Sequence, residues 1–119
     1  MRIEEPTDQE LAALMGGADA FCLPSLSEGF GLTALEALAC GAPVGVSDRA
    51  SLPEVVGDAG VVVEPTADGV RDGLASVLTD SAHAAKLRAA GPARAAEFTW
   101  ARTARGWHAA LQAAWEARG

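Results

Sequence analysis

Short apolar runs alternate along this chain with segments in which apolar residues recur at helical spacing. Residues 20–23, 44–47 and 61–63 are largely apolar runs, and continuous runs of this length are typical of strands buried on both faces of a sheet. In the intervening segments apolar residues recur every three or four positions, which predicts helices. The pattern predicts an α/β fold, with a parallel sheet covered by helices on both faces.

Two helix starts carry the capping-box pattern, in which Ser or Thr is followed three residues later by Glu. Thr7 and Glu10 open one helix, and Ser51 and Glu54 open a short one that ends before Gly57. We expect the second cap to account for Glu54 without any ligand. The apolar face of the first helix comprises Leu11, Leu14 and Met15.

From residue 66 onward the pattern predicts only helices: one around 70–78, one over 82–96 and a last one that begins near Trp100. A stripe of Trp100, Trp107, Leu111 and Trp115 follows the last helix, and core packing is its expected role. At the other end, residues 2–5 make a poor strand that could end one. We expect a single domain over 1–119, with an α/β part at 1–65 and a helical tail at 66–119.

The loop between the strand at 20–23 and the next helix carries the candidate chemistry. Gly29 and Gly31 let a ligand approach the backbone closely. The amides of Gly31, Leu32 and Thr33 have no intrahelical partners, and the helix dipole adds positive charge, so this start suits a phosphate. Gly-rich turns with nothing bound show the same pattern, so the chemistry alone leaves both interpretations open.

Composition and charge narrow the classes of partner. The net charge of −7 argues against nucleic acid or an anionic membrane surface as the main partner. Cys22 and Cys40 show no metal or redox spacing and are expected to be buried thiols of a cytosolic protein. The isolated His83 and His108 argue against a metal site. Asp48 and Arg49 are expected to form a solvated pair, and no apolar run is long enough to span a membrane.

Residues 24–37, PSLSEGFGLTALEA, closely resemble the Glu-x7-Glu signature of retaining glycosyltransferases of family 4, which have the GT-B fold. The resemblance continues at 40–44, 52–56 and 60–63 and covers roughly residues 7 to 105. It implies two Rossmann-like domains facing a cleft, with this chain resembling the second half of the donor-binding C-terminal domain. The first two strands, a basic Arg and Lys pair and the acceptor domain would then lie in missing N-terminal portions or in a second chain.

The resemblance assigns roles by position. Glu28 would be the catalytic group near the donor sugar, and Glu36 would accept hydrogen bonds from the ribose hydroxyls. The backbone at Phe30, Gly31, Leu32 and Thr33, beside Gly29, would bind the donor diphosphate. Solvated carboxylates at Glu28 and Glu36 are the alternative. A glycosidase interpretation is poor, because a phosphate-binding helix start lies between the two carboxylates rather than an open sugar site.

The function that the resemblance implies is nucleotide-sugar donor binding within a retaining hexosyltransferase. The isolated chain is expected to be inactive, because the basic pair that would stabilise the leaving diphosphate is not in this sequence. The alternative is a truncated, non-catalytic GT-B-like binding or interaction module. We expect no cofactor or essential metal, and a cytoplasmic location that is compatible with membrane association of the parent protein. We also expect the chain to self-associate or to borrow strands from a partner chain, because the strand at 20–23 would expose an edge. The resemblance further implies that the stripe of Trp100, Trp107 and Trp115 would lack cover without the other domain.

Overall fold

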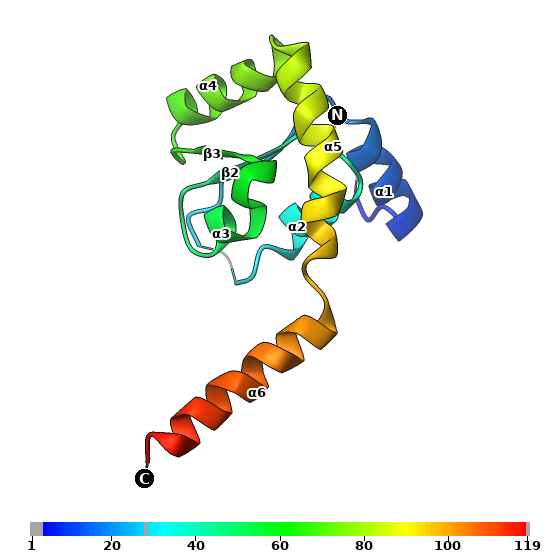
Figure 1. Cartoon of the computed structure of the whole chain (residues 1–119). Helices are drawn as coiled ribbons and strands as arrows, with labels where there is room; N and C mark the ends of the chain where they lie inside the picture. Colours follow the sequence, from blue (N-terminus) through cyan, green and yellow to red (C-terminus); the bar gives the residue numbers. More distant parts are fainter. Residues whose placement is uncertain (1–3, 28, 119) are drawn as a thin grey trace.

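The structure, a computed structural model, describes residues 4–27 and 29–118, apart from the side chain of Trp100. The elements that precede α6 pack into one body, and α6 projects away from that body (Figure 1). In chain order the elements are α1 (Asp8–Gly17), β1 (Phe21–Leu23), α2 (Leu32–Ala39), β2 (Val44–Ser47), α3 (Leu52–Val56), η1 (Gly57–Ala59), β3 (Val61–Val63), α4 (Ala67–Leu78), α5 (Ser81–Ala96) and α6 (Trp100–Glu116).

The strands form a parallel sheet in the order β1-β2-β3. Phe21 of β1 lies opposite Val44 of β2, and Val46 lies opposite Val62 of β3. The α/β fold with a parallel sheet and flanking helices is confirmed. Among the described residues no strand pairs with the outer edge of β1. The possible strand over 2–5 is wrong for Glu4 and Glu5, which are not in a strand, and its first two residues lie outside the described part of the chain.

One face of the sheet carries the main core. Val44 and Val46 point to the same side of β2 because side chains alternate along a strand, and both are fully buried. They join one apolar cluster with α2 and α3, the largest members of which are Leu38 and Leu52. α5 crosses directly over α2, since a Cβ at Gly91 would lie only 2.8 Å from the Leu38 carbonyl oxygen. The position of α2, and so of its first turn, is therefore fixed by the packed core.

The first predicted capping box is confirmed and the second is wrong. Thr7 Oγ1 accepts from the Glu10 amide at 3.2 Å, and Glu10 Oε2 accepts from the Thr7 amide at 2.8 Å. Ser51 has helical angles (φ −85°, ψ −3°) and makes no side-chain cap, whereas a capping residue needs an extended backbone to turn its oxygen toward the helix amides. The Ser51 hydroxyl donates instead to the carbonyls of Gly29 and Phe30, at 3.2 Å each.

The described part of the apolar stripe of α6 is not in the core, so the expectation of core packing is wrong for Trp107, Leu111 and Trp115. Trp107, Leu111 and Trp115 are 68%, 64% and 72% exposed, because α6 leaves the body of the molecule (Figure 1). Nor is any helix in the described ranges long and apolar enough to cross a bilayer.

Three smaller expectations have different outcomes. Cys22 and Cys40 are half-buried rather than buried. Asp48 and Arg49 form the expected ion pair on the surface. The helical tail is confirmed, with Leu87 buried on α5.

Candidate functional site

Among the residues that the structure describes, none accepts a hydrogen bond from the first backbone amides of α2, which starts at the carboxyl end of β1. Gly31 is the N-cap residue and has the left-handed angles φ 86° and ψ 36°, which a glycine adopts without strain. The first helical hydrogen bond runs from the Leu35 amide to the Gly31 carbonyl, at 3.0 Å. The amides of Leu32, Thr33 and Ala34 precede that bond and therefore point out of the helix start. With the helix dipole, they form a favourable environment for an anion.

The loop before α2 is fixed by neighbours that leave these amides open. The Ser47 hydroxyl of β2 donates to the Ser25 carbonyl, and the Ser51 hydroxyl holds the carbonyls at the end of the loop. Gly31 itself is buried against Leu52, and a Cβ at this position would lie 3.0 Å from Leu52 Cδ2. All of these contacts engage carbonyls or carbon atoms, so none of them occupies the donors at the helix start.

Glu36 lies on the same exposed side of α2 as the helix start. It is four residues after Leu32 and three after Thr33, and residues at these spacings share one helix face. All three side chains are exposed. Beside Glu36, between α1 and α2, lies an open pocket of about 290 Å³. Its lining comprises Asp8, Leu11, Ala12, Met15, Glu36, Ala39 and Cys40.

The structure thus brings most of the predicted site residues together. Gly29, Phe30, Gly31, Leu32 and Thr33 surround the helix start, and Glu36 follows one turn further along the same helix. Glu28 lies outside the described residues.

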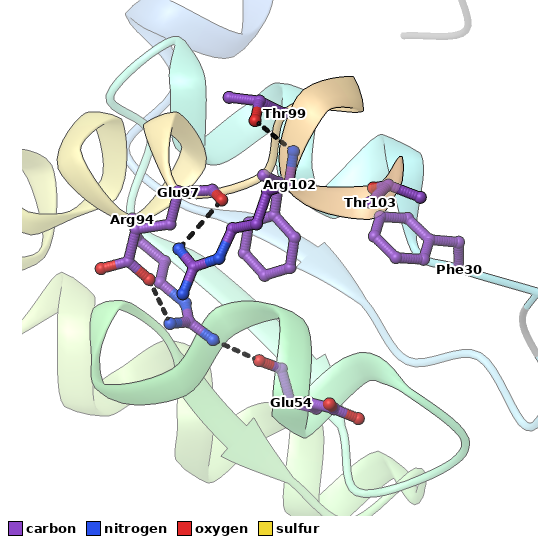
Figure 2. Close-up of a pocket in the computed structure, with 8 residues that line it drawn as sticks. Phe30, Glu54, Arg94, Glu97, Thr99, Arg102 and Thr103 are labelled. Carbon is purple, nitrogen blue, oxygen red and sulfur yellow. Dashed lines mark hydrogen bonds and ion pairs between the residues drawn. The ribbon is translucent and has the colours of Figure 1, made fainter. Parts of the chain in front are cut away.

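A second pocket, of about 350 Å³, lies on the other side of Phe30 between α3 and the junction of α5 with α6 (Figure 2). Arg94 crosses its floor and donates to Glu97 Oε2 at 2.6 Å and to the Glu54 carbonyl at 2.5 Å. These acceptors engage the Arg94 guanidinium, and a second guanidinium in the lining, that of Arg102, donates to the Glu97 carbonyl at 3.2 Å. Its lining comprises Phe30, Glu54, Arg94, Glu97, Phe98, Thr99, Arg102 and Thr103.

Sequence reasoning missed this cluster, apart from Phe30 and from Glu54, which it assigned to a helix cap. Arg94 and Phe98 follow the motif by some sixty residues, and no local spacing links them to it. An apolar residue directly before an N-cap, as Phe98 stands before Thr99, often packs on the fourth residue of the same helix, so it gives no signal of a contact with the loop.

Cys22 lies in β1, near the site, but is not suited to nucleophilic chemistry. Burial raises the pKa of its thiol above the ordinary value of 9.0. The thiol therefore stays protonated near neutral pH, and the thiolate is the reactive form.

Comparison with known proteins identifies the family. Residues 4–94 match the family model of the glycosyl transferases group 1. This match covers most of the chain and coincides with the strand, loop and helix described above. The chain belongs to the glycosyl transferases group 1 family.

Curated relatives agree with this assignment. O-antigen chain mannosyltransferase B of Escherichia coli is 44% identical over 94 residues, which cover 78% of this chain and 25% of that protein. The MMP alpha-(1->4)-mannosyltransferase of Mycolicibacterium hassiacum is 40% identical over 79% of this chain and 24% of that protein. The D-inositol 3-phosphate glycosyltransferase of Segniliparus rotundus is 39% identical over 88% of this chain and 24% of that protein. The chain spans about a quarter of the length of each of these relatives.

A solved structure shows the same fold. The sucrose-phosphate synthase of Thermosynechococcus elongatus superposes with a TM-score of 0.78 and 28% sequence identity, over 97% of this chain and 30% of that chain. Together with the family match, this confirms the resemblance to the C-terminal part of a GT-B glycosyltransferase.

Proposed function

We propose that this chain binds the nucleotide-sugar donor as part of a retaining, family 4 glycosyltransferase that transfers a hexosyl group to an acceptor. One observation carries the proposal: the open start of α2 and the carboxylate of Glu36 lie on one exposed helix face in a member of the glycosyl transferases group 1. The names of the relatives, mannosyltransferases among them, support a hexose as the transferred group.

The diphosphate of the donor would bind at the helix start. The backbone donors at Phe30, Gly31, Leu32 and Thr33 would approach it from the loop and the first turn, and Gly29 would keep this approach clear. With a net charge of −7, the chain as a whole repels a diphosphate. Local backbone amides and the helix dipole therefore carry the attraction in this proposal.

The nucleoside would lie further along α2. Glu36 would accept hydrogen bonds from the two ribose hydroxyls, and charge-assisted bonds of this kind contribute about 1.5–3 kcal/mol each. The pocket between α1 and α2 borders Glu36 and is partly lined by the apolar side chains of Leu11 and Met15. This lining suits the flat face of a nucleobase.

The reacting sugar would lie near Glu28, which we propose as the catalytic residue of this chain. The acceptor and the remaining catalytic groups would come from N-terminal portions or from a second chain. We propose no cofactor and no essential metal, because the helix start supplies the donors that a leaving diphosphate needs.

Titration of the ¹⁵N-labelled chain with GDP-mannose, UDP-glucose and ADP-glucose tests this proposal. We expect one of the three to shift the amide signals of Gly31, Leu32 and Thr33 more than any others, with saturation. Inorganic pyrophosphate should shift the same amides more weakly, because it lacks the ribose. The proposal is refuted if no donor gives a saturating shift at the helix start at concentrations up to about 10 mM. A dissociation constant above this value is weaker than that of most specific complexes.

A further inference from the structure

The loop that opens onto α2 contacts the junction between α5 and α6 through two aromatic rings. Phe30 and Phe98 meet edge to face, with their centroids 5.9 Å apart and their planes at 78°. Phe98 stands directly before the N-cap of α6 and lies beyond the residues 4–94 that match the family model. The contact therefore joins the loop to a part of the chain outside that match.

Arg94 holds Phe98 in place. Its guanidinium carbon lies 5.0 Å from the centroid of the Phe98 ring, a distance at which a cation and an aromatic face attract each other. The same guanidinium donates to the Val55 carbonyl at 3.0 Å and to the Glu54 carbonyl at 2.5 Å. These carbonyls belong to the last turns of α3, where a positive charge is favoured. Arg94 thereby fixes Phe98 to the carboxyl end of α3.

The amino end of α3 holds the loop directly. The Ser51 hydroxyl binds the carbonyls of Gly29 and Phe30, and the Leu52 side chain packs against Gly31. One end of α3 therefore holds the loop backbone. The other end binds Arg94 through the Glu54 carbonyl (Figure 2), and Arg94 contacts the Phe98 ring, which meets the Phe30 ring. The series of contacts therefore leaves the loop at its backbone, passes through α3, Arg94 and Phe98, and returns to the loop at Phe30.

We propose that Arg94 and Phe98 are positioning residues for the loop at 29–31. They fix the Phe30 ring, and with it the direction of the backbone amides that follow at the start of α2. The consequence for donor binding rests on the proposed function, whereas the effect on the loop does not.

The order of the loop in the ligand-free, full-length chain tests this proposal. ¹⁵N relaxation gives order parameters for Gly29, Phe30 and Gly31. In Phe98→Leu we expect them to fall from the rigid value of about 0.85 to below about 0.6. Phe98→Tyr keeps the ring and should keep the order. Arg94→Lys should lose it, because an ammonium group does not reproduce the planar, several-fold contact of a guanidinium.

Controls separate loop order from folding. Arg71→Lys, on exposed α4, should change nothing, and the amide signals of Leu38 and Val46 report whether the core is intact. Phe30→Leu removes the same contact between the two rings, and Phe30 is exposed. This variant therefore provides the test if Phe98→Leu unfolds the chain. Unchanged order parameters in Phe98→Leu or Phe30→Leu, with an intact core, would overturn the proposal.

A double-mutant cycle then tests the link to donor binding. Phe30→Leu and Phe98→Leu should each weaken binding of the best of GDP-mannose, UDP-glucose and ADP-glucose by about 2- to 10-fold, the range of one aromatic pair. The double variant should be no weaker than the weaker single variant, since both remove one contact. Losses that multiply would overturn the positioning role. If the parent chain binds no donor while the order parameters fall as expected, the positioning stands and the proposed function fails.

Discussion

The Arg88 guanidinium of α5 donates to the Ala18 carbonyl, which lies just before β1, at 2.6 Å. It also donates to the Gly41 carbonyl just after α2, at 3.3 Å. One side chain thereby joins the two segments that flank β1 and α2, the elements that build the site.

We predict that Arg88→Ala lowers the free energy of unfolding by about 1–3 kcal/mol, because two part-buried carbonyls lose a charged donor. Urea unfolding followed by circular dichroism measures the loss. Arg71→Ala is the matched control: its ion pairs with Asp68 and Asp72 are exposed, so its effect should stay within about 0.5 kcal/mol. Equal losses from the two variants would contradict the claim that Arg88 stabilises the fold by joining the segments at Ala18 and Gly41.

Gly31→Ala should destabilise the chain by about 1–2 kcal/mol, because a side chain at φ 86° is strained. The new Cβ would also press on Leu52 Cδ2 at 3.0 Å. Gly29→Ala is the control from the same loop, since a Cβ there would meet nothing within 4 Å. Thermal unfolding of the two variants side by side measures the difference, and a Gly31→Ala chain as stable as Gly29→Ala would show that the loop tolerates other backbone angles.

Features that depend on neighbours in the sequence could be predicted from the sequence. The strands lie where the apolar runs placed them, with the first starting at Phe21, and the cap at Thr7 forms because Glu10 is within reach. The cap at Ser51 failed because the Ser51 backbone is helical and its hydroxyl donates to loop carbonyls 22 and 21 residues away. The exposure of Trp107 could not be predicted, because helical spacing defines a face but not whether another element covers it.

The same distinction applies to the site. Gly31 and Glu36 lie where the strand, turn and helix pattern put them, since all three elements are contiguous. Arg94 and Phe98 reach the loop only because α5 crosses over α2 and ends beside α3. A contact between segments so far apart in the chain leaves no local trace in the sequence.

The Cys22 thiol should react with iodoacetamide more slowly in the folded chain than in urea. Burial raises its pKa in the folded chain, so less of the reactive thiolate is present near pH 8. The rate should rise as the pH passes above the ordinary value of 9.0. The raised pKa also favours the folded state below that value, and this contribution is lost as the pH rises through the pKa of the folded state. Mass spectrometry of the labelled peptide measures the rate, and equal rates in both states would contradict a half-buried thiol.

We predict that the chain self-associates through the outer edge of β1. The Phe21 amide already donates to the Pro43 carbonyl of the sheet, at 2.8 Å, so alternation turns the Cys22 amide to the other edge. Such an edge pairs readily with another strand. Sedimentation at about 100 µM should therefore show a dimer, which corresponds to a free energy of association of about −5 kcal/mol or stronger. Hydrogen exchange of the Cys22 amide should slow as the protein concentration rises.

Two outcomes would count against association through the β1 edge. The first is a clean monomer at this concentration. The second is a dimer that is lost in the double variant Trp107→Ser, Trp115→Ser, with an exchange rate of the Cys22 amide that does not depend on concentration. This result would place the dimer contact on the exposed stripe of α6.

The most direct test of the central claim is titration calorimetry of GDP, UDP and ADP with the parent chain, Glu36→Ala, Glu28→Ala and the surface control Glu64→Ala. Ribose contacts form in the ground state, whereas Glu28 should matter mainly near the reacting sugar. We predict that Glu36→Ala weakens binding of the preferred nucleotide by at least about 10-fold, the effect of one charge-assisted bond, while Glu28→Ala and Glu64→Ala bind like the parent. Equal losses from Glu36→Ala and Glu28→Ala, or no loss from Glu36→Ala, would contradict the assignment of α2 as the donor-binding helix.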